Sequence, residues 1–173
     1  MSVPRAIVVM GVSGVGKSTL GRALAERLGY RFIEGDDIHP AENIAKMSRG
    51  VPLEDADRWP WLARVADELA TAAAAGGGVV SCSALKRSYR DFIREHVGVT
   101  AIFVHPELSP LALRQRLQQR SGHFMPAALL ESQLMTLERP DETTEPSYVI
   151  DADLPVDEQA ELVASIIRQF VER

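Results

Sequence analysis

The sequence predicts an α/β fold in which helices cover both faces of a mainly parallel, five-stranded sheet. Two observations lead to this prediction. Short apolar segments alternate with helical patterns along the 173 residues. A glycine-rich loop also joins the first apolar segment to the first helical pattern, as in many nucleotide-binding α/β proteins. No repeat, low-complexity tract or linker divides the chain, so residues 1–173 are expected to form one domain.

The apolar segments predict strands at residues 6–10, 31–34, 79–83, 100–105 and 148–151. Their shortness and continuous apolar character are typical of strands that are buried on both faces. Helical spacing predicts helices from residue 18 onward, at about 40–49, 57–75, 86–96 and 110–120, after residue 126 to about 137, and at 156–172. Pro60 fits near the start of its helix, where a missing N–H has little consequence. The glycines at 76–78 are expected to end that helix.

Residues 11–18 have the sequence Gly-Val-Ser-Gly-Val-Gly-Lys-Ser, which matches the phosphate-loop pattern G-x-x-x-x-G-K-S/T in full. Its glycines allow a tight turn whose N–H groups face an anion, and the N-terminus of the next helix adds to the same field. Lys17 is expected to reach the β- and γ-phosphates, and the Ser18 hydroxyl to bind Mg²⁺. The chain is therefore predicted to bind a nucleoside triphosphate through Gly11, Ser13, Gly14, Val15, Gly16, Lys17, Ser18 and Thr19.

Composition argues against several other classes of protein. Hydrophobic residues make up 46% of the chain and charged residues 25%, which is ordinary for a globular protein. A net charge of −5 argues against nucleic acid as a partner. No apolar stretch approaches the roughly 20 residues that span a bilayer, and the first strand begins too early for a signal peptide. A cytoplasmic protein without a membrane partner is expected. The single cysteine, Cys82, is predicted to be a buried thiol.

Ligands of parallel α/β sheets bind beyond the carboxyl ends of the strands, so the residues after each strand are candidates for the site. Asp36 and Asp37 follow the second predicted strand. Asp36 is the predicted catalytic carboxylate, which would orient an acceptor hydroxyl, accept its proton and hold Mg²⁺ through water. Asp37 is expected to point away, because neighbouring side chains on an extended segment diverge. A solvated turn is the alternative interpretation.

Two further groups of cations suit an anionic substrate. Lys86, Tyr89 and Arg90 share one side of the helix after the third strand, where they could bind a hydroxylated acid. Arg116 and Arg120 share a face just before a glycine-containing segment. Arginines on a segment that closes over phosphates would stabilise the transition state and exclude water. For both groups, an ordinary solvated charged face is the alternative.

These residues belong to blocks that closely resemble the small bacterial-type gluconokinases, relatives of the shikimate and nucleoside monophosphate kinases. Besides the phosphate loop, the most specific blocks are Gly35-Asp36-Asp37-Ile38-His39-Pro40 and Ser83-Ala84-Leu85-Lys86 with Tyr89-Arg90. The matching blocks extend from the first strand to Met125. The resemblance implies a P-loop NTPase fold of the nucleoside-monophosphate-kinase type, with three α/β/α layers. A substrate-binding helical region is expected at about 38–75 and a helical lid at about 116–137.

The resemblance also implies transfer of the γ-phosphate of ATP to the 6-hydroxyl of D-gluconate, with Mg²⁺ as cofactor. The product, 6-phospho-D-gluconate, would feed the pentose phosphate or Entner–Doudoroff pathway. Lys17, Asp36 and Arg120 match catalytic positions, and Arg116 and Arg120 match lid arginines that contact the nucleotide. Ser18 and Asp36 match the metal positions. The substrate-binding positions are Asp36, His39, Arg58, Lys86, Tyr89, Arg90 and His123. Such proteins often form dimers, so a homodimer is left open.

Three other functions are weaker interpretations of the same residues. Shikimate kinases carry three glycines after the third strand, whereas the glycines at 76–78 precede it here. A nucleoside monophosphate kinase leaves the block from Ser83 to Arg90 unexplained. A non-catalytic nucleotide switch has no need of a general base such as Asp36. Guanine recognition by Asn-Lys-x-Asp is excluded, because Asn43 is the only asparagine and the residue directly after it is not a lysine.

Overall fold

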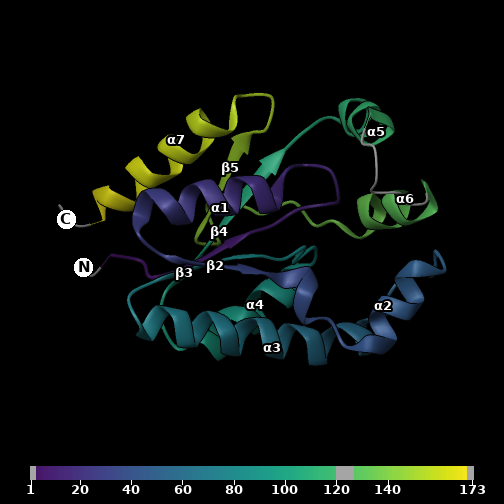
Figure 1. The fold of residues 1–173 in the computed structure, drawn as a ribbon, viewed down its shortest axis with the longest axis horizontal. Helices are drawn as coiled ribbons and strands as arrows, with labels where there is room; N and C mark the ends of the chain where they lie inside the picture. The colour runs from purple at the N-terminus through teal and green to yellow at the C-terminus, as the bar shows by residue number, and fades with distance from the viewer. Residues whose placement is uncertain (1–2, 120–126, 171–173) are drawn as a thin grey trace.

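Across residues 3–119 and 127–170, which this computed structural model describes, five parallel strands form a single sheet (Figure 1). The strands are β1 (Ala6–Val9), β2 (Arg31–Glu34), β3 (Gly78–Ser81), β4 (Ala101–Glu107) and β5 (Ser147–Asp151). Their order in the sheet is β2-β3-β1-β4-β5, with every neighbouring pair parallel. The predicted fold class is confirmed.

The helices lie close to their predicted ranges. They are α1 (Lys17–Leu28), α2 (Ala41–Ser48), α3 (Asp55–Ala74), α4 (Arg87–Val97), α5 (Pro110–Gln119), α6 (Ala127–Thr136) and α7 (Val156–Gln169). In the described ranges, none of them combines the length and the apolar character that a membrane span requires.

Alternating side chains of the strands pack against helices on opposite faces of the sheet. In β1, Ile7 and Val9 join the apolar cluster formed with α1 and α7, whereas Ala6 and Val8 join the cluster formed with α3 and α4. Figure 1 shows the two helix pairs on opposite sides of the strands. This alternation follows from the two-residue period of a strand and explains why β1 is apolar throughout.

The register brings the ends of three strands to the same edge of the sheet. Ala6 of β1 and Arg31 of β2 both pair with Gly78 of β3, so Val9, Glu34 and Ser81 end side by side. The segments that follow these strands therefore start next to one another. In Figure 1, α2, α5 and α6 lie together beyond this edge.

A 3₁₀ turn, η1 (Gly35–Ile38), follows β2 where an extended segment was expected. Two hydrogen bonds anchor its first residue: the Gly35 N–H donates to the Ser81 Oγ at 3.2 Å, and the Trp61 Nε1 donates to the Gly35 carbonyl at 2.8 Å. Only glycine fits there, because a Cβ would lie 2.0 Å from the Ser81 carbonyl oxygen. The backbone coils at this point because its first residue is held against β3 and α3.

A buried ion pair holds the loop between β3 and α4. The fully buried Arg90 donates from Nε and Nη2 to the two carboxylate oxygens of Glu145, at 2.7 and 2.9 Å. Its Nη1 donates to the carbonyls of Ala84 and Leu85, at 3.0 and 3.1 Å. Ala84 has a left-handed backbone with φ of 43°, which L-residues rarely adopt. Arg90 thus stabilises an unfavourable turn that leads into α4.

The charge of Glu145 depends on this pair. Burial alone would raise the pKa of the carboxyl group, but hydrogen bonds and positive charge from Arg90, assisted by Arg94, outweigh burial and lower it. The folded state therefore gains stability from the Glu145 carboxylate above the ordinary glutamate pKa. That gain is lost as the pH falls through the lowered pKa of the folded protein.

Replacing Glu145 with glutamine should reduce the free energy of unfolding by about 3 kcal/mol, because Arg90 would stay buried without a counter-charge. Urea denaturation followed by tryptophan fluorescence measures the change. The matched control is Glu131→Gln, since Glu131 pairs with Arg114 at the surface and exposed pairs contribute roughly 0–1 kcal/mol. Equal losses in the two variants would show that the buried pair has no special role. The difference between wild type and Glu145→Gln should shrink as the pH falls below 4.5, the ordinary pKa of that carboxyl group.

Candidate active site

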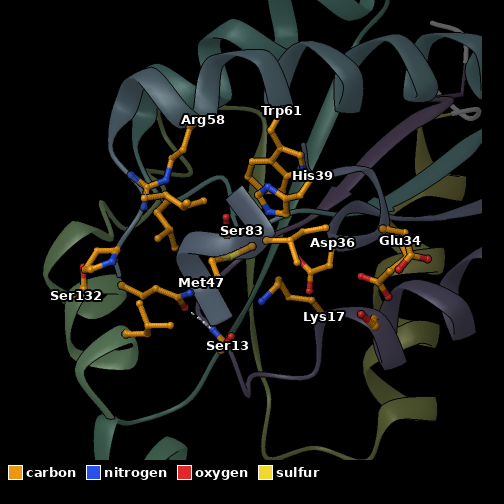
Figure 2. A pocket seen from close by; sticks show the side chains of 18 of the residues that line it. Ser13, Lys17, Glu34, Asp36, His39, Met47, Arg58, Trp61, Ser83 and Ser132 are labelled. Carbon is orange, nitrogen blue, oxygen red and sulfur yellow. Dashed lines mark hydrogen bonds between the residues drawn. The ribbon is translucent and has the colours of Figure 1, made fainter. Parts of the chain in front are cut away.

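A cavity of about 980 Å³ opens at the carboxyl edge of the sheet, with the loop after β1 on one side and α2, α3 and α6 on the others (Figure 2). Seven of the predicted site residues line it: Ser13, Lys17, Ser18, Thr19, Asp36, His39 and Arg58. They come from separate parts of the chain. Their common location follows from the aligned ends of β1, β2 and β3.

The loop after β1 has the tight turn that its glycines predict. Gly11, Gly14 and Gly16 all have positive φ values, of 127°, 91° and 92°, in the region that favours glycine. The Gly11 N–H donates to the Ser83 carbonyl at 3.0 Å, which ties the loop to the segment after β3. A Cβ on Gly14 would lie 3.1 Å from the Leu117 side chain, so the turn is also tightly packed.

Apolar packing holds this loop from behind. Val12 and Val15 are buried in a cluster with Leu113 of α5 and Leu130 of α6. The Nη1 of Arg116 donates to the carbonyls of Gly14 and Val15, both at 3.4 Å, so Arg116 lies behind the loop and does not line the cavity. Because the side chain of Val15 is buried, only its backbone could contact a bound nucleotide.

His105 of β4 lies beneath the start of the loop. A Cβ on Gly11 would lie 3.3 Å from its ring, which is 2% exposed. Burial lowers the pKa of His105 to about 4, so the ring is neutral at pH 7. Its Nδ1 has no hydrogen-bond partner among the residues that the structure describes. The ring beneath the loop is therefore buried and uncharged at pH 7.

The side chains of Lys17 and Asp36 lie next to one another at the cavity (Figure 2). The Lys17 Nζ donates to the Val12 carbonyl at 3.0 Å, which holds the ammonium group against the loop. The protein around the Asp36 carboxyl group raises its pKa above 3.8 by limiting its hydration, and the charge of Lys17 opposes this rise. The negative charges of Glu34 and Asp37 add to it. Asp36 is thus a carboxylate of increased basicity next to a cation.

The expectation that Asp37 points away from the site is wrong, because Asp37 also lines the cavity. The expectation assumed an extended segment. In a 3₁₀ turn, successive side chains are about 120° apart around the axis instead of on opposite sides. Both carboxylates of η1 can therefore face the same space.

His39 forms a neutral polar wall opposite the loop. Its ring is stacked on Trp61 with 3.9 Å between centroids, and burial followed by the charge of Arg58 lowers its pKa to about 4. The Asn43 Nδ2 donates to the Asp57 carbonyl at 2.9 Å, which fixes the orientation of this amide. The same Nδ2 lies 3.2 Å from the His39 Nδ1, which must then be the acceptor. The proton of the neutral ring is therefore on Nε2, which can donate a hydrogen bond to a ligand.

Arg58 lines the cavity, whereas Lys86 and Arg90, the other cations expected from the resemblance to bind substrate, do not. Its Nη1 donates to the Tyr89 hydroxyl at 3.1 Å, and that hydroxyl donates in turn to Asp55. The Lys86 Nζ donates to the same carboxylate at 3.1 Å. The hydrogen bond from Tyr89, followed by that from Lys86, lowers the pKa of Asp55. Lys86 and Tyr89 lie behind Arg58 and do not line the cavity, so the structure supports a positioning role for them.

Arg90 departs from its predicted role. It was expected to face the substrate because it lies four residues after Lys86 on the same side of the helix predicted at about 86–96. The structure instead buries it completely and directs its guanidinium to Glu145 and to two backbone carbonyls. The predictions for Arg120 and His123 lie outside the described residues.

Several cavity residues were not predicted from the sequence, among them Glu34, Trp61, Ser132 and Gln133. Glu34 ends β2, so the rule that sites follow strand ends would have found it. It accepts a hydrogen bond of 2.6 Å from the Ser81 Oγ. Gln133 of α6 accepts a hydrogen bond of 2.8 Å from the Ser13 N–H. No pattern in the sequence singles it out, because helical spacing does not tell which loop a helix meets.

Known proteins resemble this chain in both sequence and structure. A family model described as an AAA domain matches residues 7–140. The gluconokinase of Gluconobacter oxydans is 56% identical over 138 residues, which cover 79% of this chain and 77% of that protein. The thermosensitive gluconokinase of Escherichia coli is 42% identical, with 94% of this chain and 88% of that protein covered.

A solved structure extends the likeness to the whole fold. The crystal structure of a gluconokinase from Sinorhizobium meliloti 1021 superposes with a TM-score of 0.88 at 48% sequence identity. The match covers 99% of this chain and 96% of that chain. The resemblance seen in the sequence blocks is confirmed by these relatives.

Replacing Gly14 with alanine should weaken ATP binding about tenfold or more, because a left-handed L-residue is strained by roughly 1–2 kcal/mol and the new Cβ would press on Leu117. Isothermal titration calorimetry measures the affinity. The matched control is Gly98→Ala. Gly98 caps the end of α4 and also has a positive φ, of 74°, but among the described residues no atom beyond its chain neighbours lies within 4 Å of the added Cβ. An unchanged affinity in Gly14→Ala would mean that the loop conformation does not determine nucleotide binding.

Proposed function

The chain belongs to the gluconokinase family, and we propose from this premise that it transfers the terminal phosphate of ATP to the 6-hydroxyl of D-gluconate. The proposal depends most on one observation: a phosphate loop and a carboxylate of raised pKa share a cavity whose far wall carries an arginine and a neutral histidine. The first pair suits phosphoryl transfer, and the second suits a polyhydroxy acid. The product is 6-phospho-D-gluconate.

The nucleotide side of the cavity consists of the loop and the start of α1. The N–H groups of residues 11–18 and the N-terminus of α1 favour negative charge at this place. Lys17, already next to the loop, would place its ammonium group on the β- and γ-phosphates as their charge shifts during transfer. Arg116, at the start of the lid at residues 116–137, would add positive charge from its place against the Gly14 and Val15 carbonyls of the loop. Arg120 stays a predicted lid contact of the nucleotide.

Mg²⁺ fits the residues present. In the described parts of the chain, no group of three or more His, Cys, Asp and Glu side chains could hold a metal ion by itself. This agrees with an ion that keeps several waters and is bound mainly by phosphate oxygens, with one or two protein ligands. Ser18 and Asp36 both line the cavity and would be those ligands, directly or through water. When bound, Mg²⁺ neutralises charge on the transferred phosphate.

The acceptor side is the helical region at residues 38–75. Arg58, held by Tyr89 and through it by Asp55, would bind the carboxylate of gluconate. His39 would donate from Nε2 to a hydroxyl of the sugar acid. Asp36 would accept the proton of the attacking 6-hydroxyl, and its raised pKa makes it a better base than an ordinary aspartate. His123 stays a further candidate contact, and a cytoplasmic location and a homodimer stay predictions.

An assay with competing acceptors tests the proposal. The purified protein is incubated with ATP and Mg²⁺, and with D-gluconate, shikimate, a nucleoside monophosphate or no acceptor. ADP is measured with a coupled assay and the phosphorylated product by ³¹P NMR. We expect ADP formation that depends on gluconate and yields one phosphomonoester. A higher rate of ADP formation with another acceptor, or a rate that is the same with and without any acceptor, would overturn the proposal.

Replacing Asp36 with asparagine should lower kcat by about 10²-fold or more, with little change in ATP affinity, because a general base is lost while the loop is intact. In the wild type, kcat should fall as the pH decreases through the pKa of Asp36, which lies above 3.8. The variant should lack this decline. Asp37→Asn is the comparison variant and should lose less than about tenfold, since it leaves the base in place. Wild-type turnover in Asp36→Asn would remove Asp36 from the mechanism.

A further inference from the structure

A side chain of α6 accepts a hydrogen bond from a backbone N–H group of the phosphate loop. The Ser13 N–H donates to the Gln133 Oε1 at 2.8 Å, across 120 residues of sequence. Figure 2 shows this hydrogen bond, with Ser13 at the end of the cavity where Lys17 also lies. Both Ser13 and Gln133 line the cavity. A neutral carboxamide is therefore hydrogen-bonded to an N–H group of the loop that is expected to bind phosphates.

The position of α6 keeps this carboxamide at the loop. Leu130, one turn before Gln133, is 3% exposed and packs in the cluster that contains Val12 and Val15 of the loop. After the helix, the Glu138 N–H donates to the Leu85 carbonyl at 2.8 Å, and the Glu138 carboxylate accepts from the Arg87 N–H at 2.8 Å. Contacts on both sides of Gln133 thus restrain α6. The side chain would stay close to the loop after its bond to Ser13 is broken.

A phosphate oxygen would replace the carboxamide oxygen. Hydrogen bonds to an anion are roughly twice as strong as those between neutral groups, so the Ser13 N–H would favour phosphate. The carboxamide also carries a donor: within the described ranges, the Gln133 Nε2 makes no hydrogen bond. Rotation of the amide by about half a turn exchanges acceptor for donor without moving α6.

We propose that Gln133 is a ligand of the nucleotide phosphates, which donates from Nε2 to the same phosphate oxygen that takes the Ser13 N–H. The carboxamide that accepts the Ser13 N–H in this structure would act as a hydrogen-bond donor to the phosphate when a nucleotide is bound. This inference rests on the proposed function only in that a nucleotide phosphate must occupy the loop. It does not depend on the identity of the phosphate acceptor.

Calorimetric titration with ADP and with a non-hydrolysable ATP analogue tests the proposal. Gln133→Glu keeps the size and the acceptor of the side chain but removes the donor and adds negative charge, so affinity should fall by about tenfold or more. Gln133→Ala removes the donor but also frees the Ser13 N–H, so the loss should be smaller, about threefold. Met135→Ala is the control on the same helix, since Met135 is 88% exposed, and should bind within twofold of wild type. A loss confined to the ATP analogue assigns the contact to the terminal phosphate, and equal losses assign it to an inner phosphate.

Amide hydrogen exchange at Ser13, followed by NMR, gives a readout that needs no turnover. In the absence of nucleotide, exchange should be about fivefold faster in Gln133→Ala than in wild type, and unchanged in Met135→Ala. ADP should restore protection in every variant.

The inference would be overturned if both Gln133 variants bound nucleotide within twofold of the wild-type affinity. It would also be overturned if the exchange rate of the Ser13 amide were the same in Gln133→Ala as in wild type. Wild-type protein that binds no nucleotide would overturn the proposed function as well. Normal nucleotide binding without phosphorylation of gluconate would overturn the proposed function alone.

Discussion

The backbone turn between β1 and α1 is the constraint on which the site depends. Three residues in this turn have positive φ values, and packing leaves them little room: Gly14 lies against Leu117 and Gly11 against His105. Contacts within the protein therefore hold the turn in this conformation. A loop that the protein holds in one conformation loses less conformational freedom when it binds phosphate than a flexible loop would.

The topology of the sheet places an acceptor site beside this turn. Since β3 lies between β1 and β2, the end of β2 and the η1 turn face the phosphate loop across a single strand. Asp36 thereby comes close to Lys17, and the two groups have opposite effects on the electrostatics of the cavity. The lysine keeps the carboxylate charged, while limited hydration keeps it basic. On the far wall, His39 stays neutral because it is buried beside Arg58.

The sequence predicts the layered fold, the tight turn of the phosphate loop and the position of Asp36 at the cavity, because these follow from local patterns and from the rule that sites lie at strand ends. It does not predict which distant segment of the chain packs against a given helix face. Helical spacing predicts that Arg90 shares a helix face with Lys86, yet Arg90 is buried because Glu145 approaches it from 55 residues further along the chain. Gln133 was missed for the same reason, since its partner is 120 residues away. Asp37 was misplaced because the anchoring of Gly35 by Ser81 and Trp61 is a tertiary effect.

A crystal structure with a non-hydrolysable ATP analogue, Mg²⁺ and D-gluconate tests the central claim most directly. The account predicts phosphates on the N–H groups of residues 11–18 and the gluconate 6-hydroxyl between the Asp36 carboxylate and the terminal phosphorus. Phosphates bound away from this loop, or gluconate bound with Asp36 remote from its 6-hydroxyl, would contradict it.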